Sequence, residues 1–119
     1  MMNSYEPVRL FTVKEAIDFI HKFQGLACIA HPWLCSNALD VCKNAYELQI
    51  DGIECFPPKH HSAFGTNIFV NFAQEHGLIC SGGSDFHSIE DCSVDVGNNI
   101  FPEEFADAFL SIMKKHEII

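Results

Sequence analysis

Gly25-Leu26-Ala27-Cys28-Ile29-Ala30-His31-Pro32 is the stretch of sequence that decides how this chain folds. Its central apolar run, 26–30, follows a glycine, as expected for a β-strand buried on both faces of a parallel sheet. Because proline disfavours helical backbone in the residue before it, His31 should stay extended at the carboxyl end of this strand. Functional groups gather at that end in α/β sheets and barrels. His31 is therefore a candidate site residue, and the alternative is a histidine that only hydrogen-bonds a backbone carbonyl.

Helices are expected on both sides of this strand. Thr12 and Glu15 have the spacing of a capping box, Gly25 is placed to end that helix in a left-handed turn, and Ser36 or Asn37 can cap the next one. Further strands are expected at 53–56, 78–80 and around 97–101, and further helices at about 68–76 and after residue 102. The order predicts an α/β fold with four helices and three or four mostly parallel strands.

A second candidate motif, Gly82-Gly83-Ser84-Asp85-Phe86-His87, follows the strand at 78–80. In extended backbone, residues two apart point to the same side, so the Asp85 carboxylate and the His87 imidazole can meet at a divalent metal. The paired glycines permit a tight turn and a close approach to the backbone. An Asp-x-His triplet also occurs in solvated loops, or as a carboxylate that orients a histidine, so the triplet alone does not decide.

The strand at 53–56 contains one acid, Glu54, which either faces solvent or lies near the strand end and points into a site. The loop after this strand should lie at the same end of the sheet as His31. Its polar residues either are solvated or contact an anion; they are Lys59, His60 and His61. Two other histidines, His21 and His76, are expected to be ordinary helix residues, the second beside the last helical carbonyls.

The composition indicates one soluble globular domain over residues 1–119. Apolar stretches stop far short of the ~20 residues of a membrane helix, and the first residues lack the order of a signal peptide, so we expect a cytoplasmic protein. Six cysteines without a Cys-x-x-Cys pair are expected to be reduced residues of the core. The formal net charge of -9 argues against a nucleic-acid partner, and any phosphate chemistry would have to go through a bound cation.

Gly25 to Pro32, then Asp51-Gly52-Ile53-Glu54, then Gly82 to His87 form an ordered set of motifs. Together they resemble the C-terminal part of the PHP (polymerase and histidinol phosphatase) superfamily, and most closely its stand-alone metal-dependent phosphoesterases. The resemblance runs from about Thr12 to the end of the chain. It implies part of a distorted seven-stranded β/α barrel whose members hold two or three divalent ions, usually zinc, manganese or iron.

By this resemblance His31, Asp85 and His87 are metal ligands. Glu54 falls in the family's Gly-Ile-Glu motif and is placed near the site without being assigned as a ligand. A family stretch that could meet substrate phosphate is matched by Lys59 with His60 or His61. The implied reaction is hydrolysis of a phosphate ester by a metal-activated water, which requires no protein nucleophile.

The chain departs from the family at its beginning. Family members open with a His-x-His motif and further ligands, and this chain has no His-x-His. Three ligand positions cannot build the full metal centre, so the chain corresponds to a barrel without its N-terminal segment. We therefore expect a phosphoesterase fragment, inactive alone, that would act on a phosphorylated small molecule. The alternatives are a non-catalytic binding or assembly module with at most a weak metal site, and a truncated product without an independent role. Open strand edges would favour a homodimer or a complementing N-terminal chain.

Overall fold

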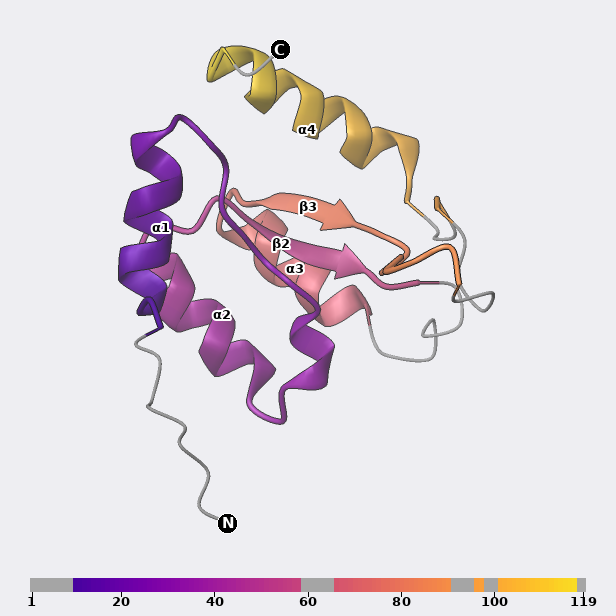
Figure 1. Ribbon diagram of the computed structural model, residues 1–119, viewed down its shortest axis with the longest axis horizontal. Coiled ribbons are helices and arrows are strands. Elements are labelled where there is room, and N and C mark those ends of the chain that lie inside the picture. Colours follow the sequence, from indigo (N-terminus) through magenta and orange to yellow (C-terminus); the bar gives the residue numbers. More distant parts are fainter. Residues whose placement is uncertain (1–9, 59–65, 91–95, 98–100, 118–119) are drawn as a thin grey trace.

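The computed structural model describes residues 10–58, 66–90, 96–97 and 101–117 (Figure 1). Within them lie four α-helices and one three-stranded parallel sheet. The predicted α/β class is thus confirmed, and the arrangement is consistent with part of a β/α barrel. Lys59, His60 and His61 lie outside the described residues. Of the strand expected around 97–101, Gly97 and Phe101 are not in a strand, and the residues between them lie outside the described part of the chain.

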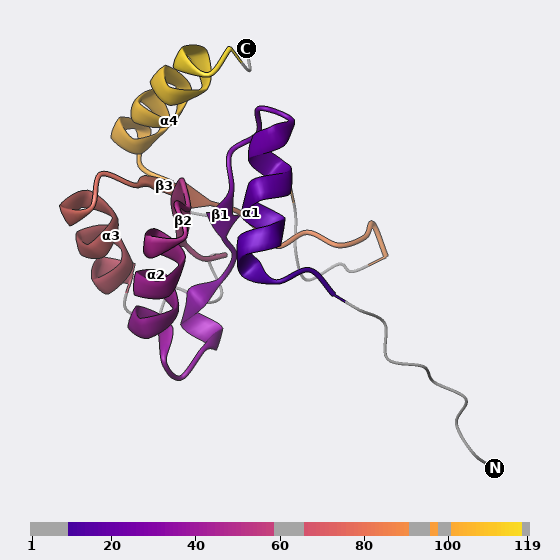
Figure 2. The same cartoon turned by 90° about the vertical axis from the view of Figure 1, so that its left-hand side faces the viewer.

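The elements alternate along the chain as the sequence predicts. They are α1 (Val13–Lys22), β1 (Cys28–Ile29), the 3-10 helix η1 (Pro32–Leu34), α2 (Ala38–Glu47), β2 (Gly52–Phe56), α3 (Thr66–Glu75), β3 (Ile79–Gly82) and α4 (Glu103–Lys115). The sheet order is β1-β2-β3, so β2 is the central strand. Helices α2 and α3 lie together on one side of the sheet, α1 lies beside β1, and α4 packs against β3 (Figures 1 and 2).

Helix α1 begins as predicted and ends differently. The Thr12 hydroxyl accepts a hydrogen bond from the Glu15 amide at 3.1 Å, and the Thr12 amide donates to the Glu15 carboxylate at 3.2 Å, which completes the capping box. Gln24, not Gly25, takes the left-handed position after the helix, with φ of 63°. Gly25 has another role: a Cβ there would lie 2.9 Å from Ile20 Cγ2, so only glycine fits against the helix.

Strand β1 is not the doubly buried strand that its apolar run predicts. Only Cys28 and Ile29 pair with β2; Cys28 is exposed and Ile29 half-buried. Among the described residues, β1 lies at one edge of the sheet and is only two residues long. The strand with a fully buried face is β2, where Ile53 and Cys55 have no exposed surface.

The main core lies between the sheet and helices α2 and α3. Its buried members are Cys42, Ile53, Cys55, Phe69, Phe72, Ala73 and Cys80. Of the described cysteines, Cys42, Cys55 and Cys80 lie in the core as predicted, whereas Cys28 and Cys35 are exposed, contrary to prediction. Helix α4 has no fully buried residue and is joined to the sheet through Phe56, whose ring lies 5.3 Å from that of Phe105. No helix in the described part of the chain is long and apolar enough to cross a lipid bilayer.

Candidate functional site

Two described loops leave the sheet at its carboxyl end, one after β1 and one after β3 (Figure 1). The first carries His31, and the second carries Asp85 and His87. Glu54 is the middle residue of β2, the strand between β1 and β3. Because all three strands are parallel, these residues belong to the same edge of the sheet, where α/β proteins bind ligands.

His31 does not continue the strand, contrary to prediction. Its backbone is left-handed, with φ of 32° and ψ of 58°, and it is the N-cap residue of η1. The following proline excludes right-handed helical backbone at this position but leaves the left-handed region open, and that conformation turns the chain directly into η1. The His31 carbonyl accepts the Leu34 amide at 3.1 Å, and the His31 ring lies 6.4 Å from that of Trp33. His31 is exposed to solvent.

Glu54 is half-buried and points away from the face of β2 that buries Ile53 and Cys55. Its Oε2 atom accepts a hydrogen bond from the His31 amide at 2.7 Å. A Cβ placed on Gly83 would lie 3.4 Å from its other oxygen, Oε1. The Glu54 carboxylate therefore lies against the beginnings of both loops.

Asp85 and His87 are close neighbours, although not for the predicted reason. Asp85 is left-handed, with φ of 57°, so the alternation of an extended strand does not apply here. His87 Nδ1 lies 2.6 Å from the Asp85 carbonyl oxygen and 3.8 Å from Asp85 Oδ1. Because a carbonyl only accepts, the hydrogen lies on Nδ1, and Nε2 of the neutral ring keeps its lone pair. The two side chains are 54% and 73% exposed, respectively.

The side chains of His31, Asp85 and His87 are of the types that bind divalent metals, but the three do not lie close together. Carboxylate and imidazole are ligands for zinc, manganese and iron. Among the described residues, no three His, Cys, Asp or Glu side chains gather closely enough to hold an ion. The structure brings Asp85 and His87 together on one loop and places His31 on another.

A second polar cluster, which sequence reasoning missed, lies at the opposite end of the strands. Asp51 Oδ2 accepts from His21 Nε2 at 2.6 Å and from the Ala27 amide at 2.7 Å. The pair opens onto a cavity of about 450 Å³ that is also lined by Gln24, Gly25, Lys115, His116 and Glu117. The sequence signal was weak, because His21 and Asp51 are thirty residues apart and belong to different elements.

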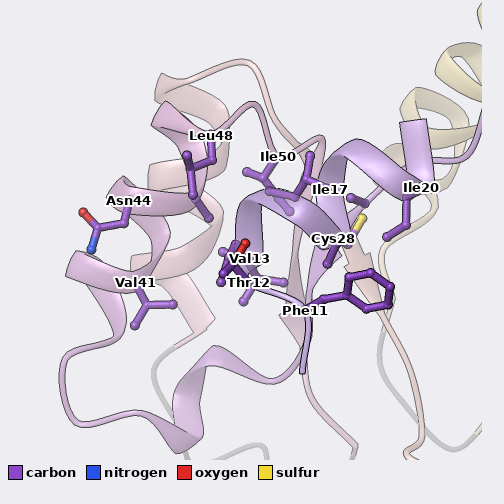
Figure 3. Close-up of a pocket in the computed structure, with 14 residues that line it drawn as sticks. Phe11, Thr12, Val13, Ile17, Ile20, Cys28, Val41, Asn44, Leu48 and Ile50 are labelled. Carbon is purple, nitrogen blue, oxygen red and sulfur yellow. The ribbon is translucent and has the colours of Figure 1, made fainter. Parts of the chain in front are cut away.

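An apolar groove of about 490 Å³ lies between α1 and α2, beside β1 (Figure 3). The residues that line it include Ile17 and Ile20 from α1, Val41 and Leu48 from α2, and Phe11 from the segment before α1. Such a lining suits hydrophobic packing and offers few groups for catalysis.

The thiol of Cys28 lies in a confined environment at the edge of the sheet. Its sulfur lies over Gly52, where a Cβ would be only 2.8 Å from it. Although the residue as a whole is exposed, its sulfur is packed against the backbone, and this desolvation, helped by the negative charge of Asp51, raises the pKa of the Cys28 thiol to about 11. The thiolate is thus disfavoured, and Cys28 does not have the character of a catalytic nucleophile.

Comparison with known proteins gives a partial relationship. No described protein family and no solved structure matches the chain. The chain is 32% identical over 74 residues to the phosphoribosyl 1,2-cyclic phosphate 1,2-diphosphodiesterase of Eggerthella lenta. The match covers 62% of this chain and 28% of that enzyme, so the chain corresponds to less than a third of the relative. The similarity is thus to a phosphoesterase, and it covers only part of the chain.

Proposed function

We propose that this chain is the C-terminal part of a PHP-type metal-dependent phosphoesterase, working in the cytoplasm on a phosphate ester of a small molecule. The observation that carries the proposal is the 32% identity to a cyclic phosphate diphosphodiesterase. The parallel sheet, with His31 and the Asp85 loop at its carboxyl end, supports it.

In this proposal His31, Asp85 and His87 hold zinc, manganese or iron. The hydrogen bond from His87 Nδ1 to the Asp85 carbonyl leaves Nε2 as the ligand atom and fixes the ring, as outer hydrogen bonds commonly do for metal-bound histidines. A divalent metal, when bound, polarises phosphoryl oxygens and lowers the pKa of a water so that it attacks at neutral pH. Lys59, with His60 or His61, would contact the substrate phosphate.

The chain alone should not be a competent catalyst. Its proposed ligands come from two separate loops, and the described residues contain no group of three donors close enough to hold an ion. The missing ligands would come from a complementing N-terminal chain. The formal net charge of -9 also argues against activity of the chain alone, because bound cations would be needed to attract a phosphate.

The second candidate function is a binding or assembly module with at most a weak metal site. The observation that favours it is the apolar groove beside edge strand β1 (Figure 3). An edge strand next to exposed apolar residues, here Phe11 and Val13, is a common pairing surface. A homodimer or the complementing chain would bury it.

Metal content and phosphoesterase activity of the purified chain test both candidates. The wild-type protein, His31→Ala and a control, His116→Ala, are loaded with zinc or manganese, analysed for bound metal and assayed with bis(p-nitrophenyl) phosphate. We expect metal in the wild type and the control, less in His31→Ala, and no turnover in any. Metal uptake without turnover supports either the phosphoesterase fragment or the assembly module with a weak metal site. Absence of metal uptake rejects the fragment and also the module in its metal-binding form.

Sedimentation of the chain separates the fragment from the assembly module. A dimer that dissociates on Ile29→Lys, at the β1 edge, supports the module. A monomer that gains turnover when mixed with a polypeptide carrying the His-x-His segment supports the two-chain enzyme.

A further inference from the structure

Glu54 is the acidic residue of the central strand, and it is not left in open solvent. Its neighbours Ile53 and Cys55 have no exposed surface, and Glu54 is half-buried on the opposite face. Its carboxylate reaches the carboxyl edge of the sheet, where Oε2 lies 2.7 Å from the His31 amide nitrogen. A hydrogen bond to a carboxylate is shorter and stronger than one between neutral groups.

The hydrogen bond from the His31 amide to Glu54 supports a residue whose backbone conformation is unfavourable. A left-handed conformation is unfavourable for a residue with a side chain, and a following proline narrows the choice further. Sparsely populated conformations persist only where the surroundings determine them. The hydrogen bond from the His31 amide to Glu54 is a long-range interaction that supports this conformation, and the bond between Leu34 and the His31 carbonyl closes the turn locally.

The same carboxylate also lies close to the other loop. Oε1 is the atom that a Cβ on Gly83 would meet, at 3.4 Å, and the Gly83 amide donates to the Phe56 carbonyl at 3.4 Å. Gly83 lies two residues before Asp85. One side chain thus lies against the loop that bears His31 and the loop that bears Asp85 and His87.

We propose that Glu54 is a positioning residue, which fixes the His31 loop opposite the loop that carries Asp85 and His87. It acts through the backbone of His31 and not as a ligand. The inference deepens the proposed function, on which its consequence for metal affinity rests; the placement of His31 itself is independent of metal. Glu54→Gln keeps an oxygen acceptor of the same shape, whereas Glu54→Ala removes it, and Glu47→Gln on the exposed part of α2 is the matched control.

Amide hydrogen exchange of the ¹⁵N-labelled, metal-free protein is the first measurement. We expect the His31 amide to exchange about tenfold faster in Glu54→Ala, less so in Glu54→Gln, and at the wild-type rate in Glu47→Gln. Circular dichroism melts show whether each variant is folded at the temperature used. If Glu54→Ala is folded and its His31 amide exchanges at the wild-type rate, the proposal is wrong.

Titration with Co²⁺, a spectroscopic substitute for zinc, is the second measurement. We expect Glu54→Ala to bind Co²⁺ about tenfold more weakly, Glu54→Gln to recover part of the loss, and the visible spectrum at saturation to be unchanged. A changed spectrum in Glu54→Gln would make Glu54 a ligand and overturn the assignment. If the wild type binds no Co²⁺, the proposed metal function fails, and the exchange rates alone decide whether Glu54 positions His31.

Discussion

Each end of the sheet carries an aspartate beside a histidine, and the two pairs differ in what surrounds them. At the amino end, His21 Nε2 lies 2.6 Å from Asp51 Oδ2, and the side chains are 34% and 19% exposed. At the carboxyl end, His87 Nδ1 lies 3.8 Å from Asp85 Oδ1, and both side chains are mostly exposed. The same two residue types thus form a short, partly buried hydrogen bond between distant segments at one end and an exposed pair within one loop at the other.

The difference shows how the surroundings decide the role of a His-Asp pair. The Asp51 carboxylate bonds a side chain of α1 and the Ala27 amide before β1, so it joins three segments of the chain. Within the described part of the chain, Asp85 makes no such long-range bond, and the hydrogen bond of His87 is to the backbone of its own loop. We infer that the first pair stabilises the fold, while the second leaves donor atoms free for a ligand.

The largest expected effect is on metal binding at the carboxyl end. In Asp85→Ala or His87→Ala, zinc affinity should fall by at least about a hundredfold, because loss of a ligand costs more than the 10–100-fold typical of an outer-sphere partner. The free energy of unfolding should change by less than about 0.5 kcal/mol, since both side chains are exposed. Competition titration with a zinc-binding dye and urea unfolding measure the two quantities. A large loss of stability would show that this pair, too, is structural.

The converse change, Asp51→Ala, should lower the free energy of unfolding by about 3 kcal/mol. It removes a charged acceptor from His21 and leaves the Ala27 amide without its side-chain partner. Urea unfolding monitored by tryptophan fluorescence gives the value, with Asp40→Ala on the exposed side of α2 as the control. Equal stabilities of the Asp51 and Asp40 variants would show that the pair at the amino end of the sheet does not stabilise the fold.

The pKa of Cys28 tests the electrostatic influence of Asp51 at the amino end, because the Asp51 charge helps to raise the pKa of this thiol. With a pKa raised from 9.0 to about 11, the thiolate fraction at pH 8 is about a hundredfold lower than in an ordinary thiol. Alkylation by iodoacetamide should therefore be slow at pH 8 and accelerate about tenfold per pH unit until the pH approaches the pKa. Site-resolved mass spectrometry follows the reaction, and Cys28→Ser identifies the signal. Fast, pH-independent labelling of Cys28 would contradict the raised pKa.

The smallest effect is expected at Gln24, which lines the amino-end cavity and has left-handed backbone. Gln24→Gly should raise the free energy of unfolding by about 0.5–1 kcal/mol, because glycine adopts this conformation without steric cost. Thermal and urea unfolding measure the gain, and Lys22→Gly at the last residue of α1 should do the opposite. No gain at Gln24 would mean that the polar cavity holds this side chain by contacts of its own.

Local signals in the sequence predicted the helices well. The capping box at Thr12 is present, and Gly77 closes α3 with φ of 68°. His76 Nδ1 donates to the Phe72 carbonyl at 2.8 Å, as its place beside the last helical carbonyls predicted. Each of these features depends on residues within about four positions of one another, so the sequence contains all the partners.

The membership of the candidate site stays a prediction, and its geometry differs from the one expected from the sequence. The resemblance nominated His31, Asp85, His87 and Glu54, and the structure places all four near the carboxyl edge of the sheet. Left-handed backbone at His31 and Asp85 was not foreseen, because it depends on how each loop turns after its strand. The bond between Glu54 and His31 joins residues on different elements, and no spacing rule predicts it.

The sequence by itself determined the alternation of helices and strands, their parallel order and the polar residues at the strand ends, because periodicity, caps and turn residues act over short distances. Only the tertiary structure decided that β1 lies at the edge of the described sheet, that Asp51 bonds to α1, and that Glu54 bonds to the His31 amide and lies close to Gly83. Those outcomes depend on which surfaces remain once the sheet is assembled. An apolar run shows that a strand can be buried, and its neighbours decide whether it is.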